Sequence, residues 1–234
     1  KQKINDVKSY GKWLMIELDD YYLFSHLRME GKYFIKNNKD PLIRHEHVVF
    51  GLENGVELRY MDVRKFGKMQ LVEKNLVDKV GPLLSLGLEP WDEGLNLGYL
   101  KEKFKKKRLP IKSVLLDQSI IVGIGNIYAD EILFLAKINP LARAMDLSDS
   151  NLDLIIKYTR EVLEKAIDEG GTTIRSYSSV DGVHGRHQNN LFVHCREGQK
   201  CFDCASLIVK IKVGGRGTYY CPNCQKEVLN VSSN

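Results

Sequence analysis

The pattern of polar and apolar positions divides the chain into a β-rich first part and a helical second part. Between residues 10 and 80, short apolar runs alternate with turn residues, which predicts short strands in a sandwich or barrel. Asp19-Asp20 marks one two-residue turn, and Asn54-Gly55 is the strongest short hairpin signal in the chain. We expect strands at 13–18, 21–27, 32–36, 47–50, 56–60 and 68–72.

From about residue 99 the apolar residues recur with a helical period. We expect helices at 99–108, at 113–121 with Ser113 as its N-cap, and at 127–137. A longer helix follows Ser148 and ends at Gly170-Gly171. Its predicted buried face consists of Leu152, Ile155, Ile156, Thr159, Val162, Leu163 and Ala166. Residues 172–190 then lose this period and are rich in Ser, Gly, His and Asn, which is typical of a functional or a disordered loop.

Four cysteines near the end of the chain have the spacing of a metal site. Cys201 and Cys204 form one Cys-x-x-Cys pair, and Cys221 and Cys224 form a second pair after sixteen residues. Four thiolates complete the tetrahedral ligand set of a structural Zn²⁺ ion, with no open position for a substrate. The intervening residues predict a β-hairpin whose turn is rich in glycine and carries Arg216. We therefore expect a zinc finger with a cation at its tip.

Composition limits the function classes. The 234 residues are 43% hydrophobic and carry a net charge of +5, as in an ordinary globular protein. No apolar run approaches a membrane span, and the polar first residues do not resemble a secretory signal. Five cysteines, four of them in metal spacing, fit a reducing compartment, and Cys195 is expected to be a free thiol.

Three further stretches are candidates for binding an anionic partner. The basic run 101–112 reads either as a solvated helix face or as a phosphate-binding stripe. In residues 123–131, a glycine turn precedes a helix, so Asn126 either caps that helix or donates to a phosphate. In residues 62–67, Arg64 and Phe66 either enter a DNA duplex, or Phe66 is a core residue and the charge of Arg64 is solvated.

Seven motifs in this order resemble the formamidopyrimidine-DNA glycosylase family over essentially the whole chain. They are Gly11-Lys-Trp13, His26-Leu-Arg-Met-Glu-Gly31, Arg44-His-Glu-His47, Asp62-Val-Arg-Lys-Phe-Gly67, Gly123-Ile-Gly-Asn-Ile-Tyr128, Gly171-Thr-Thr173 and the Gly214-Gly-Arg-Gly217 hairpin. The resemblance implies an α+β multidomain fold with an N-terminal β-sandwich, truncated here, a helix-two-turn-helix domain and a C-terminal zinc-finger β-hairpin. We expect these domains at 1–82, 83–190 and 191–234, with a lesion-covering loop at 176–190.

The resemblance also implies a function in base-excision DNA repair. Such enzymes evert oxidised purines from duplex DNA, cleave the glycosidic bond and nick the abasic site by β,δ-elimination. By resemblance, Met29, Arg64 and Phe66 would fill the gap left by the everted nucleotide, because extrusion costs a few kcal/mol of unstacking. Phosphates would be held by Lys12, His45, Lys107, Asn126 and Arg216. The pocket for the damaged base would include Glu30, Ser176 and Tyr177.

The family's nucleophile is an N-terminal proline followed by glutamate, whereas this sequence opens with Lys1-Gln-Lys-Ile-Asn-Asp6. Lys12 and Arg216 are associated with proton transfer in the family, although a guanidinium hardly deprotonates, which favours positioning for Arg216. We expect residues 1–234 alone to form no borohydride-trapped adduct with 8-oxoguanine DNA.

Two other functions stay open at this stage: a truncated, inactive protein that binds damaged DNA, and a zinc-finger transcription factor. The single finger, without a recognition helix, argues against the transcription factor. The expected partner is duplex DNA containing an oxidised purine or an abasic site. The expected protein is a bacterial, cytoplasmic, nucleoid-associated monomer that contacts no membrane.

Overall fold

The computed structural model describes residues 1–172 and 185–226, which cluster into two compact units. Of these described residues, unit 1 comprises 1–85 with Thr172 and Gly185, and unit 2 comprises 86–171 and 186–226. No helix in the described part of the chain is long and apolar enough to cross a membrane.

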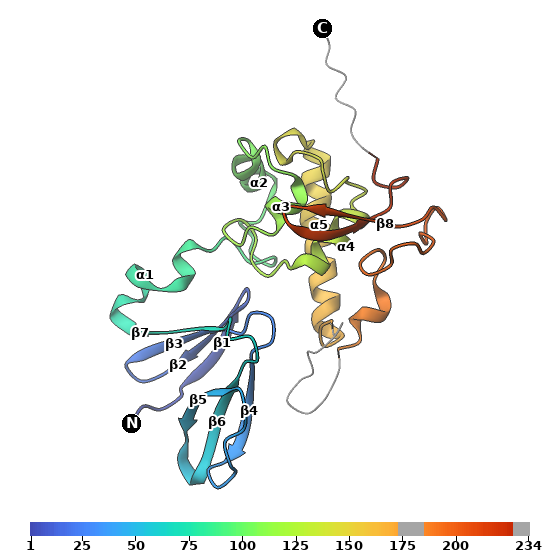
Figure 1. Cartoon of the computed structure of the whole chain (residues 1–234). Coiled ribbons are helices and arrows are strands. Elements are labelled where there is room, and N and C mark those ends of the chain that lie inside the picture. Colours follow the sequence, from blue (N-terminus) through green and yellow to red (C-terminus); the bar gives the residue numbers. More distant parts are fainter. Residues whose placement is uncertain (173–184, 227–234) are drawn as a thin grey trace. The chain divides into compact units, whose positions relative to one another are not determined.

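Unit 1 contains two antiparallel sheets (Figure 1). The first sheet has the strand order β1-β2-β3-β7, and the second has the order β4-β6-β5. The bounds are β1 Asp6–Tyr10, β2 Trp13–Glu17, β3 Tyr21–His26, β4 Lys32–Asn37, β5 Glu46–Gly51, β6 Val56–Met61 and β7 Lys68–Glu73. Every predicted strand is present, and β1 is an additional strand that the pattern did not show. The predicted sandwich is confirmed.

The turns of unit 1 follow from local chemistry. Asp19-Asp20 joins β2 to β3, and Asn54 and Gly55 both adopt positive φ between β5 and β6. Asparagine and glycine tolerate this conformation better than other residues, so the predicted hairpin forms where they stand. Between the sheets, Tyr33 of β4 donates to the Ser25 hydroxyl of β3 at 2.8 Å.

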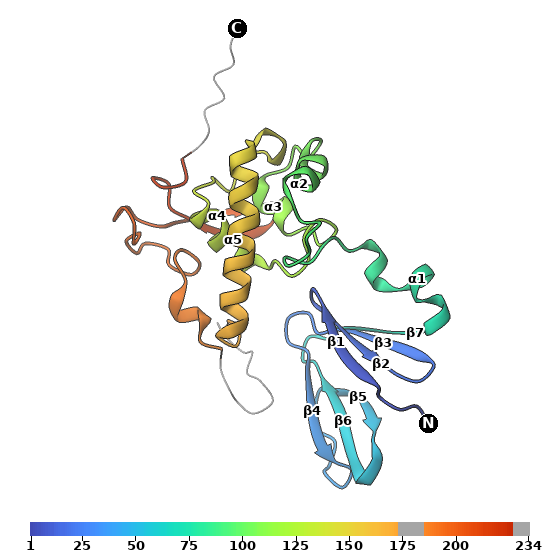
Figure 2. The ribbon, with the colours of Figure 1, turned by 180° about the vertical axis from the view of Figure 1, so that it is seen from behind.

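Unit 2 is built around a helical core (Figure 2). Its helices are α2 Leu97–Phe104, α3 Ile111–Leu115, α4 Asn126–Leu135 and α5 Asp149–Asp168; the short α1, Val77–Val80, belongs to unit 1. Ser148 caps α5 through a capping box with Asn151, which fixes the start of this helix. All seven residues predicted for its inner face are buried. The prediction of the long helix is confirmed.

Three helix predictions had wrong bounds. The first helix ends at Phe104 rather than residue 108, because Phe104 is the last residue that it buries in the core. The second spans Ile111–Leu115, with Pro110 rather than Ser113 at the N-cap position. It stops early because the Gln118 side chain bonds the backbone of Leu116, Gly123 and Ile124, which shapes a turn instead. The third begins at Asn126 and ends at Leu135, two residues before the expected end.

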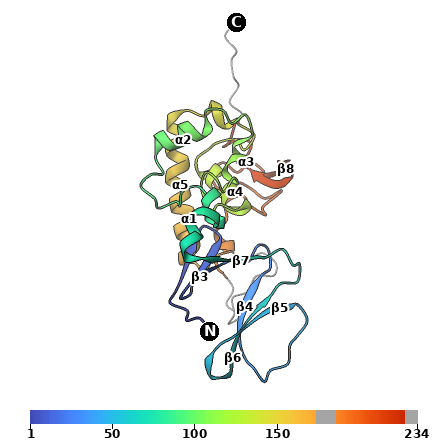
Figure 3. The same cartoon turned by 90° about the vertical axis from the view of Figure 1, so that its left-hand side faces the viewer.

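The C-terminal hairpin consists of β8, Val209–Val213, and β9, Arg216–Tyr220. Gly214 and Gly215 form its turn, both with positive φ. Figure 3 shows β8 beside α3 and α4, and two close approaches fix this placement. A Cβ added at Gly214 would lie 2.6 Å from the Ser113 hydroxyl, and the Asn126 amide donates to the Gly217 carbonyl at 3.0 Å. Glycine is therefore required at position 214.

Candidate nucleic-acid interface and metal centre

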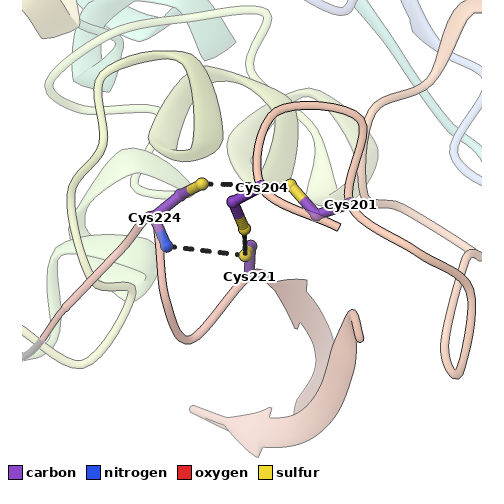
Figure 4. A group of neighbouring side chains, drawn as sticks. All are labelled: Cys201, Cys204, Cys221 and Cys224. Atoms are coloured by element: carbon purple, nitrogen blue, oxygen red, sulfur yellow. Dashed lines mark hydrogen bonds between the residues drawn. The ribbon is translucent and has the colours of Figure 1, made fainter. Parts of the chain in front are cut away.

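The four cysteines converge as the spacing predicted (Figure 4). Their sulfur atoms all lie within 4.8 Å of one another, with 3.4 Å between the sulfurs of Cys204 and Cys221 and 3.9 Å between those of Cys201 and Cys224. Tetrahedral Zn–S bonds of about 2.3 Å require sulfur separations of about 3.8 Å. The set therefore fits a single Zn²⁺ ion. Cys195 is exposed and lies outside this set.

The metal centre is attached to a small apolar cluster. Cys201 and Cys221 are buried with Phe134, Val193 and Ile208. Phe134 belongs to α4, and Leu135, the last residue of that helix, packs against both this cluster and the large core of unit 2. This arrangement gives the hairpin a rigid base on α4.

Asn126 and Arg216 are brought together at the hairpin. Asn126 is the first residue of α4, and its Nδ2 donates to Gly217, the neighbour of the exposed Arg216. The Asn126 Oδ1 is buried without a hydrogen-bond partner in the described structure. The Arg216 guanidinium is an exposed donor group, and the Asn126 amide has a second N–H besides the one bound to Gly217.

Lys107 lies in the segment between α2 and α3, and its side chain is a little over one-third exposed. Its ammonium contacts the Asp117 carboxylate at 3.2 Å. This is a partly exposed ion pair, which a phosphate could replace at modest cost. Lys107 is not in a regular helix, contrary to the sequence expectation.

Lys112, which belongs to the basic run 101–112, is not part of an exposed basic surface. Its side chain is completely buried and forms an ion pair with Asp130, also buried, and it donates to the Asn126 carbonyl at 3.3 Å. Burial lowers the pKa of Lys112 below its ordinary value, and Asp130 opposes this effect. The residue is therefore a structural partner of α4 rather than part of a phosphate-binding surface.

The acidic pair of α4 holds the segment before the finger. Glu131 accepts from the backbone amides of Phe192, Val193 and His194 at 2.7–3.1 Å. Asp130 contacts the His194 ring at 2.7 Å. The sequence analysis did not identify Asp130 and Glu131, although two adjacent acids in an otherwise apolar helix indicate buried polar partners.

In unit 1, the loop between β6 and β7 presents Arg64 and Phe66. Phe66 is 50% exposed, and the Arg64 guanidinium carbon lies 4.6 Å from the centre of its ring. The exposure excludes the alternative that Phe66 is a core residue. The buried Asp62 carboxylate accepts from the backbone amides of Arg64 and Gly67, which fixes the loop.

The loop between β3 and β4 presents Met29 and Glu30. Met29 is 59% exposed, an unusual position for so apolar a side chain. The His26 ring at the start of the loop accepts from the Arg28 amide at 3.0 Å. Burial, aided by nearby positive charges, lowers the pKa of His26 to about 4, so the ring stays a neutral acceptor near pH 7.

The segment between β4 and β5 carries His45, which is half-buried and has a φ of 75°. Buried Arg59 of β6 holds this segment by donating to the carbonyls of Asn37, Asp40 and Pro41 and to the carboxylates of Glu46 and Glu57. Lys12 is exposed in the two-residue turn between β1 and β2. Ser176, Tyr177 and most of the predicted loop 176–190 lie outside the described residues; residues 187–190 form a short 3₁₀ helix.

A cavity of about 640 Å³ in unit 2 is lined by residues around Trp91 and Arg160 and includes none of the predicted site residues. The predicted site residues that are exposed lie instead on loops of unit 1 and on the hairpin of unit 2.

Comparison with known proteins assigns the family. Three family models match successive parts of the chain: the formamidopyrimidine-DNA glycosylase N-terminal domain at residues 1–69, its H2TH domain at 86–178, and a zinc finger found in FPG and IleRS at 198–226. A formamidopyrimidine-DNA glycosylase of Oceanobacillus iheyensis is 47% identical over 96% of this chain and 80% of the relative. This chain belongs to the formamidopyrimidine-DNA glycosylase family.

Other relatives agree with this assignment. The formamidopyrimidine-DNA glycosylase of Exiguobacterium sibiricum is 46% identical over 98% of this chain and 83% of its own length. Among solved structures, a complex between the Lactococcus lactis Fpg and DNA containing an abasic site superimposes with a TM-score of 0.89 at 40% identity. A MutM complex with DNA containing carbocyclic 8-oxo-G gives a TM-score of 0.88 at 40% identity. Each structure is matched over 97% of this chain and 83% of its own chain.

Proposed function

We propose that this protein acts in base excision repair as a DNA glycosylase with abasic-site lyase activity, and that residues 1–234 supply its recognition of oxidised purines in duplex DNA. Family membership, with relatives named as formamidopyrimidine-DNA glycosylases at 45–47% identity, is the observation that carries this proposal. Two similar structures are complexes with DNA that contains an abasic site or carbocyclic 8-oxo-G. The exposed Met29, Arg64 and Phe66 side chains support the same function.

In this proposal Phe66 wedges between base steps, Arg64 faces the orphaned base, and Met29 fills the gap. A large apolar side chain that is half exposed on a fixed loop is well suited to replace the stacking lost on eversion. The guanidinium that lies over the Phe66 ring presents its donors toward a base edge.

Phosphates flanking the lesion would be bound by Lys12, His45, Lys107, Asn126 and Arg216. The contact between Asn126 and Gly217 supports a shared role for Asn126 and Arg216, because it fixes the hairpin on α4. Zn²⁺ would stabilise the base of that hairpin and take no part in the reaction. Lys12 is also the candidate for proton transfer, and Arg216 the candidate for orienting a phosphate.

Glu30, Ser176 and Tyr177 are proposed to line the pocket for the damaged base. We also propose the functional division 1–82, 83–190 and 191–234. The relatives come from bacteria, and a reducing, cytoplasmic location near the nucleoid fits both the substrate and the four thiolates.

The proposal is tested by measuring affinity of residues 1–234 for two duplexes that differ only in 8-oxoguanine or guanine opposite cytosine. The wild-type chain should prefer the damaged duplex. Phe66→Ala should reduce that preference roughly tenfold, because one stacking contact is lost. Val63→Ala is the matched control, since Val63 is exposed in the same loop. Equal affinity of the wild-type chain for both duplexes would contradict the proposal.

A further inference from the structure

Two buried side chains of unit 1, Tyr60 and Asp62, lie where the three loops that carry Met29, His45 and Phe66 converge. Tyr60 is the fifth residue of β6 and is 5% exposed, and Asp62 follows the strand and is 1% exposed. The Tyr60 hydroxyl donates to the Asp62 Oδ2 at 3.2 Å. Neither side chain reaches the surface to contact DNA.

Asp62 binds the Arg64–Phe66 loop through its carboxylate. Its Oδ1 accepts from the Arg64 amide at 3.0 Å, and its Oδ2 accepts from the Gly67 amide at 2.8 Å. Burial would raise the pKa of Asp62, but these hydrogen bonds outweigh burial and hold the pKa below its ordinary value. The carboxylate therefore stays ionised, and an ionised acceptor makes stronger hydrogen bonds to amides than a neutral one.

Asp62 binds the His45 segment through its backbone. Its amide donates to the His45 carbonyl at 3.0 Å, and its own carbonyl accepts from the His47 Nε2 at 2.8 Å. His45 has positive φ, which is an uncommon conformation for a residue other than glycine and needs support from its surroundings. Asp62 thus contacts two of the three loops.

The Tyr60 hydroxyl reaches the third loop. A Cβ added at Gly31, which ends the Met29 loop, would lie 2.4 Å from this hydroxyl, and one added at Gly67 would lie 1.7 Å from it. Both loops therefore close onto the same oxygen atom, and only glycine permits either approach. Burial, followed by the Asp62 charge, raises the pKa of Tyr60, so the hydroxyl remains a donor.

We propose that Tyr60 and Asp62 are positioning residues that hold the three loops in one fixed arrangement before DNA binds. The inference rests on the proposed function, since the loops matter only if their side chains enter the damaged duplex. Wedge insertion requires Phe66, Arg64 and Met29 to arrive together, because each fills part of the gap left by one nucleotide. Preorganisation removes the entropy that would otherwise be lost when the loops become ordered on binding.

The test compares Tyr60→Phe with Tyr33→Phe. Tyr33 is a neighbouring ring at 5.2 Å whose hydroxyl bonds Ser25 instead of the loop network, so both variants lose one hydroxyl from the same part of unit 1. Affinities for 8-oxoguanine and undamaged duplexes are measured below the thermal transition of each variant. A 2-aminopurine beside the lesion reports base unstacking by its fluorescence.

Tyr60→Phe should reduce the ratio of the two affinities roughly fivefold, the effect of one hydrogen bond. It should also reduce the 2-aminopurine signal at saturating protein. Tyr33→Phe should leave both readouts within about twofold of wild type, since no loop contact is lost. Asp62→Asn, which cannot accept from both amides, should have a larger effect than Tyr60→Phe on both readouts.

Each other outcome has a defined meaning. An unchanged affinity ratio and an unchanged 2-aminopurine signal in Tyr60→Phe would overturn the inference. An equal loss of affinity for the damaged and the undamaged duplex in Tyr60→Phe would also overturn it, because general destabilisation of the protein lowers both affinities together. If the wild-type chain itself shows no preference for the damaged duplex, the proposed function fails rather than the positioning role.

Discussion

The two units bury hydrophobic and polar side chains in different proportions. Among the described residues, unit 1 buries four hydrophobic side chains, Ile16, Phe24, Tyr60 and Val72, whereas one cluster in unit 2 contains twenty buried hydrophobic residues. Unit 1 relies correspondingly on polar groups, including buried Arg59 and Asp62 and the neutral ring of His26. Polar interactions depend on direction and on protonation, while apolar packing depends mainly on area and shape.

This contrast matches the proposed roles of the two units. Loops that must present Met29, Arg64 and Phe66 in one geometry are held by hydrogen bonds, which fix directions. The helical unit must carry a hairpin, and packing together with Zn²⁺ gives it a rigid base. We therefore expect hydrogen bonds of polar groups to supply a larger share of the stability of unit 1, and metal and core volume a larger share of that of unit 2.

The largest expected effect is loss of the metal site. Cys221→Ser should reduce bound zinc from one equivalent per chain to none and unfold the finger, because structural zinc supplies on the order of 10 kcal/mol to such modules. Zinc content is measured by a colorimetric chelator assay, and folding of the finger by near-ultraviolet circular dichroism. Cys195→Ser is the control, since this exposed thiol lies outside the site. A zinc-free wild-type protein with an unchanged spectrum would contradict the prediction.

A core truncation in unit 2 should be the next largest effect. Ile132 of α4 is completely buried in the large cluster, so Ile132→Ala should lower the free energy of unfolding of unit 2 by about 3 kcal/mol. Denaturant unfolding should give the same loss of the free energy of unfolding at pH 7 and at pH 5, because the substitution removes no titrating group. Ile167 of α5 is 65% exposed, so Ile167→Ala should change the free energy of unfolding of unit 2 by less than about 0.5 kcal/mol. A loss that differs between the two pH values would break the distinction between the units.

The effect that is smallest near pH 7 concerns His26 of unit 1. Its pKa is about 4 in the folded chain, below the ordinary value of 6.5, so the unfolded chain binds more protons between these values. Stability of unit 1 should therefore fall as pH decreases from 6.5 toward 4. His26→Asn, which retains a hydrogen-bond acceptor for the Arg28 amide, should make this decrease shallower. The measurement is thermal unfolding across that pH range, and parallel curves for wild type and variant would refute the assignment.

The sequence predicted those features that depend on neighbouring residues. Strand alternation, the Asn54-Gly55 turn, the Ser148 cap and the Cys-x-x-Cys spacing all act within a few residues, so their outcome could be read directly from the chain. The ends of α3 could not be predicted in this way. It begins after Pro110, and its C-terminal end depends on Gln118, whose side chain bonds the backbone of Leu116, Gly123 and Ile124 and so shapes a turn.

Burial of charged residues was the main failure of prediction. Lys112 stands in a basic run and is expected to be solvated, yet Asp130, eighteen residues later, neutralises it inside the core. Glu131 and its three amide donors lie more than sixty residues apart. A lone sequence does not show which distant group will satisfy a buried charge.

By itself, then, the sequence determined the order of strands and helices, the four ligands of the zinc site and the motifs shared with the glycosylase family. Only the tertiary structure decided which charged residues face solvent and which groups hold the proposed DNA-contacting loops. The physical reason is the range of the interactions. Turns, caps and metal spacing are local, whereas the contacts of Tyr60 with Gly31 and of Asn126 with Gly217 exist only once distant segments have packed together.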